Sequence, residues 1–169
     1  KAQAEGLKVK VGRWTIPGSP IAVLVDFNPY FDKKNEIYAE MWEKYQVDSL
    51  HAYGDYDEAS MFSYAASLVV EDLYMYLGLS SQKVIYHANE WMCGLGMLRI
   101  NNRLPKVGTI FTTHATSIGR SIAGNNKPLY DYLWAYNGDQ MASELNVESK
   151  HSIEKQSAKY ADCFTTVSD

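Results

Sequence analysis

The chain has 169 residues, 46% of them apolar and 21% charged, which indicates one globular domain and excludes a disordered chain. Its formal net charge is −4 and it has no run of basic residues, so nucleic acid is not an expected partner. No apolar run is long enough to cross a membrane, so no membrane partner is expected either. The two cysteines, Cys93 and Cys163, form no Cys-x-x-Cys motif, which favours a reducing, cytoplasmic location.

The first elements predict a β-hairpin. Residues 8–14 begin with alternating polarity, which is typical of a strand. The Pro-Gly-Ser-Pro segment at residues 17–20 has the composition of a turn. Residues 21–25 form a continuous apolar run, so we expect the second strand to be buried on both faces.

An amphipathic helix is predicted next, over residues 33–46. Ile37, Met41 and Tyr45 recur at four-residue intervals, which places them on one face of a helix. We interpret this stripe as core packing and not as a binding surface.

A second helix is predicted from about Asp55 to Leu77. Asp55 and Glu58 have the spacing of a capping box, and Gly78 is a plausible end of the helix. The expected buried face consists of Phe62, Ala65, Ala66, Val69, Leu73 and Tyr76, and it is widened by Met61, Leu68 and Val70. A helix that is apolar over most of its circumference is expected to be central to its domain.

Buried strands then alternate with helices along the chain. The patterns predict, in order, a strand at 83–86, a helix at 92–103, a strand at 109–113, a short aromatic helix at 129–136 within an otherwise irregular stretch at 121–147, a polar helix at 148–160 and a strand at 163–167. Gly94 and Gly96 cost the first of these helices about 1 kcal/mol each, so a packing or ligand-approach reason is expected for them. The alternation predicts an α/β fold with a mainly parallel, doubly wound sheet and helices on both faces, preceded by the hairpin. We expect residues 1–169 to form a single domain.

Polar side chains follow two of the predicted strands. Asn89 and Glu90 come after the first, and His114 and Thr116 come after the second, with Arg120 a few residues further on. Because the carboxyl ends of parallel strands meet at one edge of a sheet, we expect these groups to share a crevice. A carboxylate, an imidazole and a guanidinium together suit a polar substrate that carries hydroxyls and a phosphate.

The same residues also allow a structural interpretation. A single histidine after a strand is more often structural than catalytic, and Glu90 could be a solvated loop carboxylate. Residues 117–119 could begin a helix whose free N–H groups favour an anion. From the residues alone, both interpretations stay open.

Several well-known motifs are missing. The chain contains no Gly-x-Gly-x-x-Gly, no Walker loop and no Gly-x-Ser-x-Gly elbow. The four histidines lack the spacing of metal ligands, so we expect neither a metal nor a cofactor.

Specific stretches resemble the animal and fungal type of glycogen synthase, a family of retaining glycosyltransferases with the two-domain GT-B fold. The resemblance is carried by Glu90-Trp91, by residues 112–120 (Thr-Thr-His-Ala-Thr-Ser-Ile-Gly-Arg), by residues 12–14 and by residues 161–168 (Ala-Asp-Cys-Phe-Thr-Thr-Val-Ser). It spans nearly the whole chain and implies a Rossmann-like domain. The implied activity is transfer of glucose from a nucleotide-glucose donor to the non-reducing end of an α-1,4-glucan, without a metal.

The resemblance also implies roles for the candidate residues. His114 would be a catalytic residue beside the donor glucose, and Glu90 a second one on the acceptor side. Arg120, with Asn89 and Thr116, would bind substrate, Arg120 near the donor phosphate. The family has histidine where this chain has Asn89, which puts that position's role in doubt.

The resemblance further implies that the chain is part of the amino-terminal domain of a longer enzyme and inactive alone. The family's donor loop would precede residue 1, and its second domain would follow residue 169. The full-length protein could be a homo-oligomer. Two other functions stay open: another nucleotide-sugar glycosyltransferase of the GT-B fold, or a non-catalytic glucan-binding or assembly module. Whether the donor is UDP-glucose or ADP-glucose is not decided by these residues.

Overall fold

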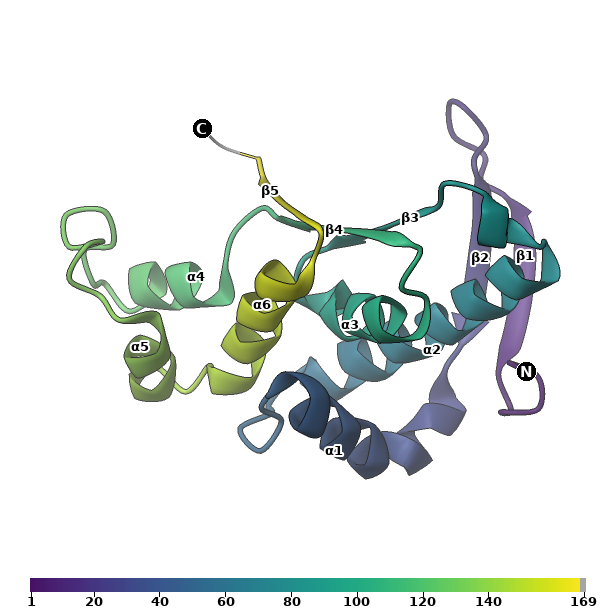
Figure 1. The fold of residues 1–169 in the computed structure, drawn as a ribbon. Helices are drawn as coiled ribbons and strands as arrows, with labels where there is room; N and C mark the ends of the chain where they lie inside the picture. Colours follow the sequence, from purple (N-terminus) through teal and green to yellow (C-terminus); the bar gives the residue numbers. More distant parts are fainter. Residues whose placement is uncertain (168–169) are drawn as a thin grey trace.

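The computed structural model describes residues 1–167. Figure 1 shows a hairpin, a small sheet and a group of helices beneath that sheet. The elements in chain order are β1 (Lys8–Arg13), β2 (Ile21–Asp26), η1 (Asn28–Lys33), α1 (Lys34–Tyr45), α2 (Tyr56–Tyr76), η2 (Leu79–Ser81), β3 (Ile85–Asn89), η3 (Trp91–Cys93), α3 (Gly94–Arg103), β4 (Gly108–Thr113), α4 (Ser117–Gly124), α5 (Gly138–Glu144), α6 (Glu148–Tyr160) and β5 (Cys163–Thr166). None of the helices in residues 1–167 combines the length and apolarity needed to cross a membrane.

The central sheet has the strand order β3-β4-β5, and both pairs of strands are parallel. Ala88 of β3 lies opposite Phe111 of β4, which in turn lies opposite Phe164 of β5. The two phenylalanine rings stack with their centroids 6.0 Å apart. The predicted α/β class, the parallel sheet flanked by helices and the leading hairpin are therefore confirmed.

The helices that contact this sheet lie over one of its faces. In β3, Ala88 is buried whereas its neighbours His87 and Asn89 are exposed, as expected when only one face is covered. In Figure 1, α2, α3 and α6 all lie on the same side of the sheet. The sequence predicts helices on both faces, but strands added in sequential order through right-handed crossovers place every connecting helix on one side.

The two glycines of α3 have a packing role, one of the two reasons expected for them. A Cβ at Gly96 would overlap the backbone oxygen of Ser63 on α2. A Cβ at Gly94 would overlap the side chains of Ile153 and Ser157 on α6. Without side chains at these positions, α3 approaches both neighbouring helices closely, and this sandwich supports the sheet from below.

Helix α2 is central, as predicted, but its buried face differs in part from the expected one. Ala65 and Val69 are buried as expected, whereas Phe62 is 40% and Tyr76 is 86% exposed. The error arises because α2 packs on α3 through small polar residues such as Ser63, which an apolar pattern does not mark. The helix ends where expected, since Gly78 has a φ of 64° and can take this left-handed conformation without strain.

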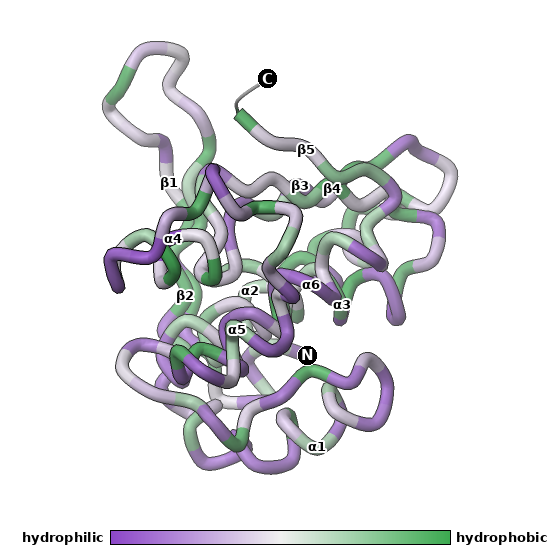
Figure 2. The backbone as a smooth tube through the Cα atoms, turned by 90° about the vertical axis from the view of Figure 1, so that its left-hand side faces the viewer, coloured by the Kyte–Doolittle hydropathy of each residue, from purple (hydrophilic) through white to green (hydrophobic). Residues whose placement is uncertain are grey.

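The hairpin corrects another expectation. Strands β1 and β2 pair antiparallel as a separate two-stranded sheet, and the β2 side chains are not buried on both faces. Ile21 is 66% exposed and Leu24 is 67% exposed. Figure 2 shows hydrophobic stretches along this hairpin, which projects beyond the body of the molecule. The apolar run identified a strand correctly, but only Val25 packs against the core and most side chains of β2 stay exposed.

Three further expectations were wrong in detail. Asp55 precedes α2, but its side chain makes no cap and instead accepts a hydrogen bond from Lys150 at 2.7 Å. Residues 129–135 form successive turns and not a helix, and Trp134 is 93% exposed there. The stretch expected to be irregular contains helix α5 and the second half of α4. The last strand ends at Thr166, and Ser168 of the family-like segment lies outside the described residues.

Candidate active site at the carboxyl edge of the sheet

Glu90 connects the ends of β3 and β4. Its backbone N–H donates to the carbonyl oxygen of Thr112 at 2.8 Å, which extends the strand pairing by one residue. Its backbone has φ 66° and ψ 166°, a region that glycine adopts almost alone. A non-glycine residue in this region costs about 1–3 kcal/mol, and such strain is concentrated at functional sites. The conformation turns the Glu90 side chain back towards the loop after β4.

The Glu90 carboxylate holds the backbone of His114. Oε1 of Glu90 accepts a hydrogen bond from the His114 backbone N–H at 2.7 Å. The preceding residue, Thr113, is buried, whereas His114 is exposed. His114 therefore lies at the surface on a backbone that the Glu90 carboxylate holds by this hydrogen bond.

Arg120 is carried by the first turn of α4. Thr116 caps this helix, because its Oγ1 accepts from the Gly119 backbone N–H at 3.0 Å. Its carbonyl oxygen also accepts from the Arg120 backbone N–H at 3.0 Å. The Arg120 side chain is exposed and makes no ion pair with another residue in 1–167. Its guanidinium remains available for a phosphate or carboxylate ligand.

A buried carboxylate lies behind this segment. Glu154 of α6 is only 5% exposed, and both of its oxygens accept from the backbone N–H of Ser117, at 2.9 and 2.8 Å. The pKa of Glu154 is raised to about 7, mainly by burial and in addition by nearby Glu90, although the hydrogen bonds from Ser117 and the charge of Arg120 oppose the shift. The expected anion-binding N–H groups of α4 are therefore partly occupied by a carboxylate of the chain itself.

Asn89 lies at the same edge but on the open face of the sheet. It is opposite Thr112 in the register and is exposed. Thr112 belongs to a polar row across the three strands, because its Oγ1 is 2.7 Å from Nε2 of His87 and 2.6 Å from Oγ1 of Thr165. This row was not predicted, since its members come from three separate strands.

The structure thus brings most of the predicted site residues together. Glu90 and His114 are in direct contact, and Thr116 and Arg120 follow on the same segment. Within the described residues, the side chains of Asn89 and Arg120 form no hydrogen bond with either Glu90 or His114. Sequence reasoning did not identify Glu154 as part of this region. The available signal was a glutamate directly after Ile153, which lies on the buried face of an otherwise polar helix.

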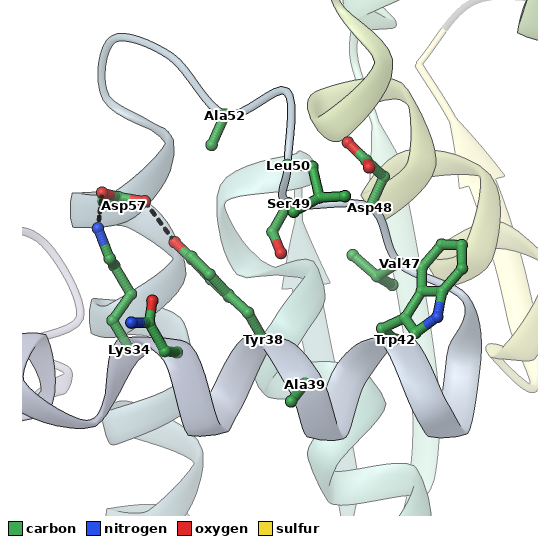
Figure 3. Close-up of a pocket in the computed structure, with 11 residues that line it drawn as sticks. Lys34, Tyr38, Ala39, Trp42, Val47, Asp48, Ser49, Leu50, Ala52 and Asp57 are labelled. Atoms are coloured by element: carbon green, nitrogen blue, oxygen red, sulfur yellow. Dashed lines mark hydrogen bonds and ion pairs between the residues drawn. The ribbon is translucent and has the colours of Figure 1, made fainter.

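The structure also contains a cavity away from this edge of the sheet. A cavity of about 610 Å³ is enclosed by α1, the segment after it and the start of α2, and Figure 3 shows its lining. Its principal polar groups already bind one another, since Asp57 accepts from Lys34 and from the hydroxyl of Tyr38, both at 2.6 Å. Helix α1 lies far below the sheet in Figure 1, so this cavity is separate from the strand ends. We prefer the strand edge because its imidazole and guanidinium are not engaged in such pairs.

No group of three or more potential metal-ligating side chains is present in residues 1–167. The fold and the edge together define an α/β domain in which the exposed His114 and Arg120 follow the carboxyl end of a parallel strand, which is where open α/β sheets commonly bind ligands.

Comparison with known proteins identifies the family. The family model for glycogen synthase matches residues 1–169. A glycogen [starch] synthase of Dictyostelium discoideum is 31% identical over 166 residues, 97% of this chain and 18% of that relative. The liver glycogen [starch] synthase of Rattus norvegicus is 30% identical over 164 residues, 97% of this chain and 23% of the relative. A glycogen [starch] synthase of Caenorhabditis elegans is 28% identical over 167 residues, 99% of this chain and 25% of the relative.

The chain belongs to the glycogen synthase family. It spans between 18% and 25% of the length of these curated relatives.

Proposed function

We propose that this chain works as part of a longer glycogen synthase of the GT-B type. That enzyme would transfer glucose from a nucleotide-glucose donor to the non-reducing end of an α-1,4-glucan, with retention of configuration. The observation that carries this proposal is the contact between the Glu90 carboxylate and the His114 backbone at the sheet edge, in a chain of this family. The residues outside this chain would supply the donor loop and a second domain, so we expect the chain alone to be inactive.

Each residue at the edge has a proposed task. His114 would meet the donor glucose, and its fixed backbone would keep the imidazole oriented without cost at the moment of reaction. Arg120 would approach the donor phosphate, where a guanidinium stabilises the negative charge that develops on the leaving group. Glu90 would lie on the acceptor side and hold His114 in place. Asn89 and Thr116 would complete the substrate contacts, and Thr116 also caps the helix that carries Arg120.

The proposal is tested in the complete enzyme by release of nucleoside diphosphate from UDP-glucose or ADP-glucose in the presence of glycogen. We expect His114→Ala and Arg120→Ala each to lower kcat/KM by about 100-fold or more while the fold stays intact. The matched controls are His51→Ala and Lys106→Ala, which remove an exposed histidine and an exposed cation away from the strand ends. Normal turnover by both site variants would remove these residues from the site.

Two assays separate this function from its alternatives. Transfer of glucose to sucrose or a lipid, but not to glucan, would favour another glycosyltransferase of the same fold. Binding of glucan by this chain without any transferase activity in the complete enzyme would favour a binding or assembly module. A comparison of glucan binding by the wild-type chain and by Glu90→Ala then tests whether the glucan-binding surface includes Glu90.

The cellular setting is a further part of the proposal. Cys93 and Cys163 are unpaired, which suits the cytoplasm. A homo-oligomeric state of the complete enzyme is testable by light scattering.

A further inference from the structure

Glu154 is a buried acid whose position is unusual for an ordinary core residue. It comes from α6, 37 residues beyond its partner Ser117 in the sequence, and both of its oxygens face a single backbone N–H. Ser117 is the first residue of α4, directly after the cap residue Thr116. One side chain therefore ties α6 to the point where the segment after β4 becomes a helix.

The surroundings of Glu154 contain few charges that could balance it. A cavity of about 220 Å³ adjoins it, lined on the same helix by His151 and Lys155, both of which are paired with Asp139 of α5. Arg120 lies on the α4 side and Glu90 on the side of β3. Helix α3 meets α6 at Gly94, which carries no charge. No ion pair to Glu154 is present in the described part of the chain.

We propose that Glu154 is a positioning residue which clamps the start of α4 to α6 and so sets the placement of the segment that carries His114 and Arg120. The link to those two residues rests on the proposed function, whereas the clamp itself does not. Within the described residues Glu154 forms no hydrogen bond with His114 or Arg120, so it would act on them through the Ser117 backbone. Loss of the clamp would release the first turn of α4, and Arg120 with it.

The clamp is sensitive to pH in a defined direction. The pKa of Glu154 is raised by burial, so the closed clamp binds the proton more tightly than an opened, hydrated one. The closed state is therefore favoured at low pH and weakens as the carboxylate ionises near pH 7. A neutral glutamine can still accept the Ser117 N–H bond with its amide oxygen but has no charge to bury.

Amide hydrogen exchange at Ser117 tests the clamp in this chain without any activity assay. After correction for intrinsic exchange, we expect its protection to fall about tenfold between pH 6 and pH 8. In Glu154→Gln the protection should be independent of pH, and in Glu154→Ala it should be about tenfold lower than wild type at pH 6. Glu148→Gln, which changes the other glutamate of α6, should behave as wild type, and the amide of Phe111 reports whether each variant stays folded.

Kinetics of the complete enzyme test the positioning role. Glu154→Ala should lower kcat about tenfold with a smaller change in KM, and Glu154→Gln should restore kcat and remove an ionisation near pH 7 from the profile. Wild-type exchange at Ser117 in both variants would overturn the clamp. Altered exchange with unchanged kinetics would overturn the positioning role. If the wild-type enzyme has no transferase activity, the proposed function fails while the exchange result still decides the clamp.

Discussion

The hairpin has the more apolar strand of the two sheets but leaves it the more exposed, since β2 reads Ile-Ala-Val-Leu-Val-Asp and β4 reads Gly-Thr-Ile-Phe-Thr-Thr. Phe111 in β4 is 1% exposed, whereas Leu24 in β2 is 67% exposed. Strand β4 lies between two parallel neighbours and above closely packed helices, while β2 pairs only with β1. The difference teaches that an apolar run indicates how much surface a strand could bury, and that the neighbouring elements decide how much it does bury.

The largest expected effect on stability comes from the close packing beneath the central sheet, which the hairpin lacks. Gly96→Val should destabilise the chain by about 4 kcal/mol, because the new side chain meets the backbone oxygen of Ser63, which cannot move independently of α2. Urea unfolding followed by circular dichroism measures this loss. Gly12→Val in β1 is the matched control, since no atom lies within 4 Å of a Cβ there, and it should change stability by less than about 0.5 kcal/mol. Similar losses in both variants would contradict the comparison.

The second-largest effect concerns Glu154, the buried glutamate of α6 near the central sheet. Glu154 ionises at about 7 when folded, above the usual value of 4.5, so the folded chain binds more protons between these values. Its contribution to stability is complete below pH 4.5 and is lost as the pH rises through 7, by on the order of 3 kcal/mol in all. The difference in unfolding free energy between wild type and Glu154→Gln, measured from pH 5 to pH 8, isolates this residue from other titrating groups. A difference that does not vary with pH would sink this prediction.

A smaller effect should reveal the strain at the strand end. Glu90→Ala removes the hydrogen bond to His114 and keeps the unfavourable backbone, whereas Glu90→Gly removes both. We expect the glycine variant to be more stable than the alanine variant by about 2 kcal/mol. This would be the reverse of the usual order of these residues in regular structure. An alanine variant that is the more stable of the two would show that the site is not strained.

The smallest effect belongs to the hairpin. Leu24→Ser should change the stability of this chain by less than about 0.5 kcal/mol, because the side chain is already 67% exposed. Leu98→Ser, at a position that is 0% exposed, should cost several times more. Thermal unfolding of both variants gives the ratio. A large loss for Leu24→Ser would mean that β2 is covered in solution.

Much of the candidate site was predictable because it depends on short-range order. Glu90 and His114 each follow a strand directly, and parallel strands bring their carboxyl ends to the same edge, so their proximity required only the correct strand pattern. Glu154 was not predictable in the same way, because its role depends on how α6 packs against the start of α4. The strained backbone of Glu90 likewise has no sequence signal, since glutamate does not favour that conformation.

The sequence by itself determined the α/β class, the positions of the main strands and helices, the family and the identity of the polar residues at the strand ends. These properties follow from local periodicity and from short motifs, which act within a few residues. Only the tertiary structure decided which face of the sheet is covered, that the hairpin strands are exposed, and that a carboxylate from α6 holds the helix carrying Arg120. Burial and pKa depend on neighbours that are distant in the chain, and the free energy of those contacts exists only once the chain has folded.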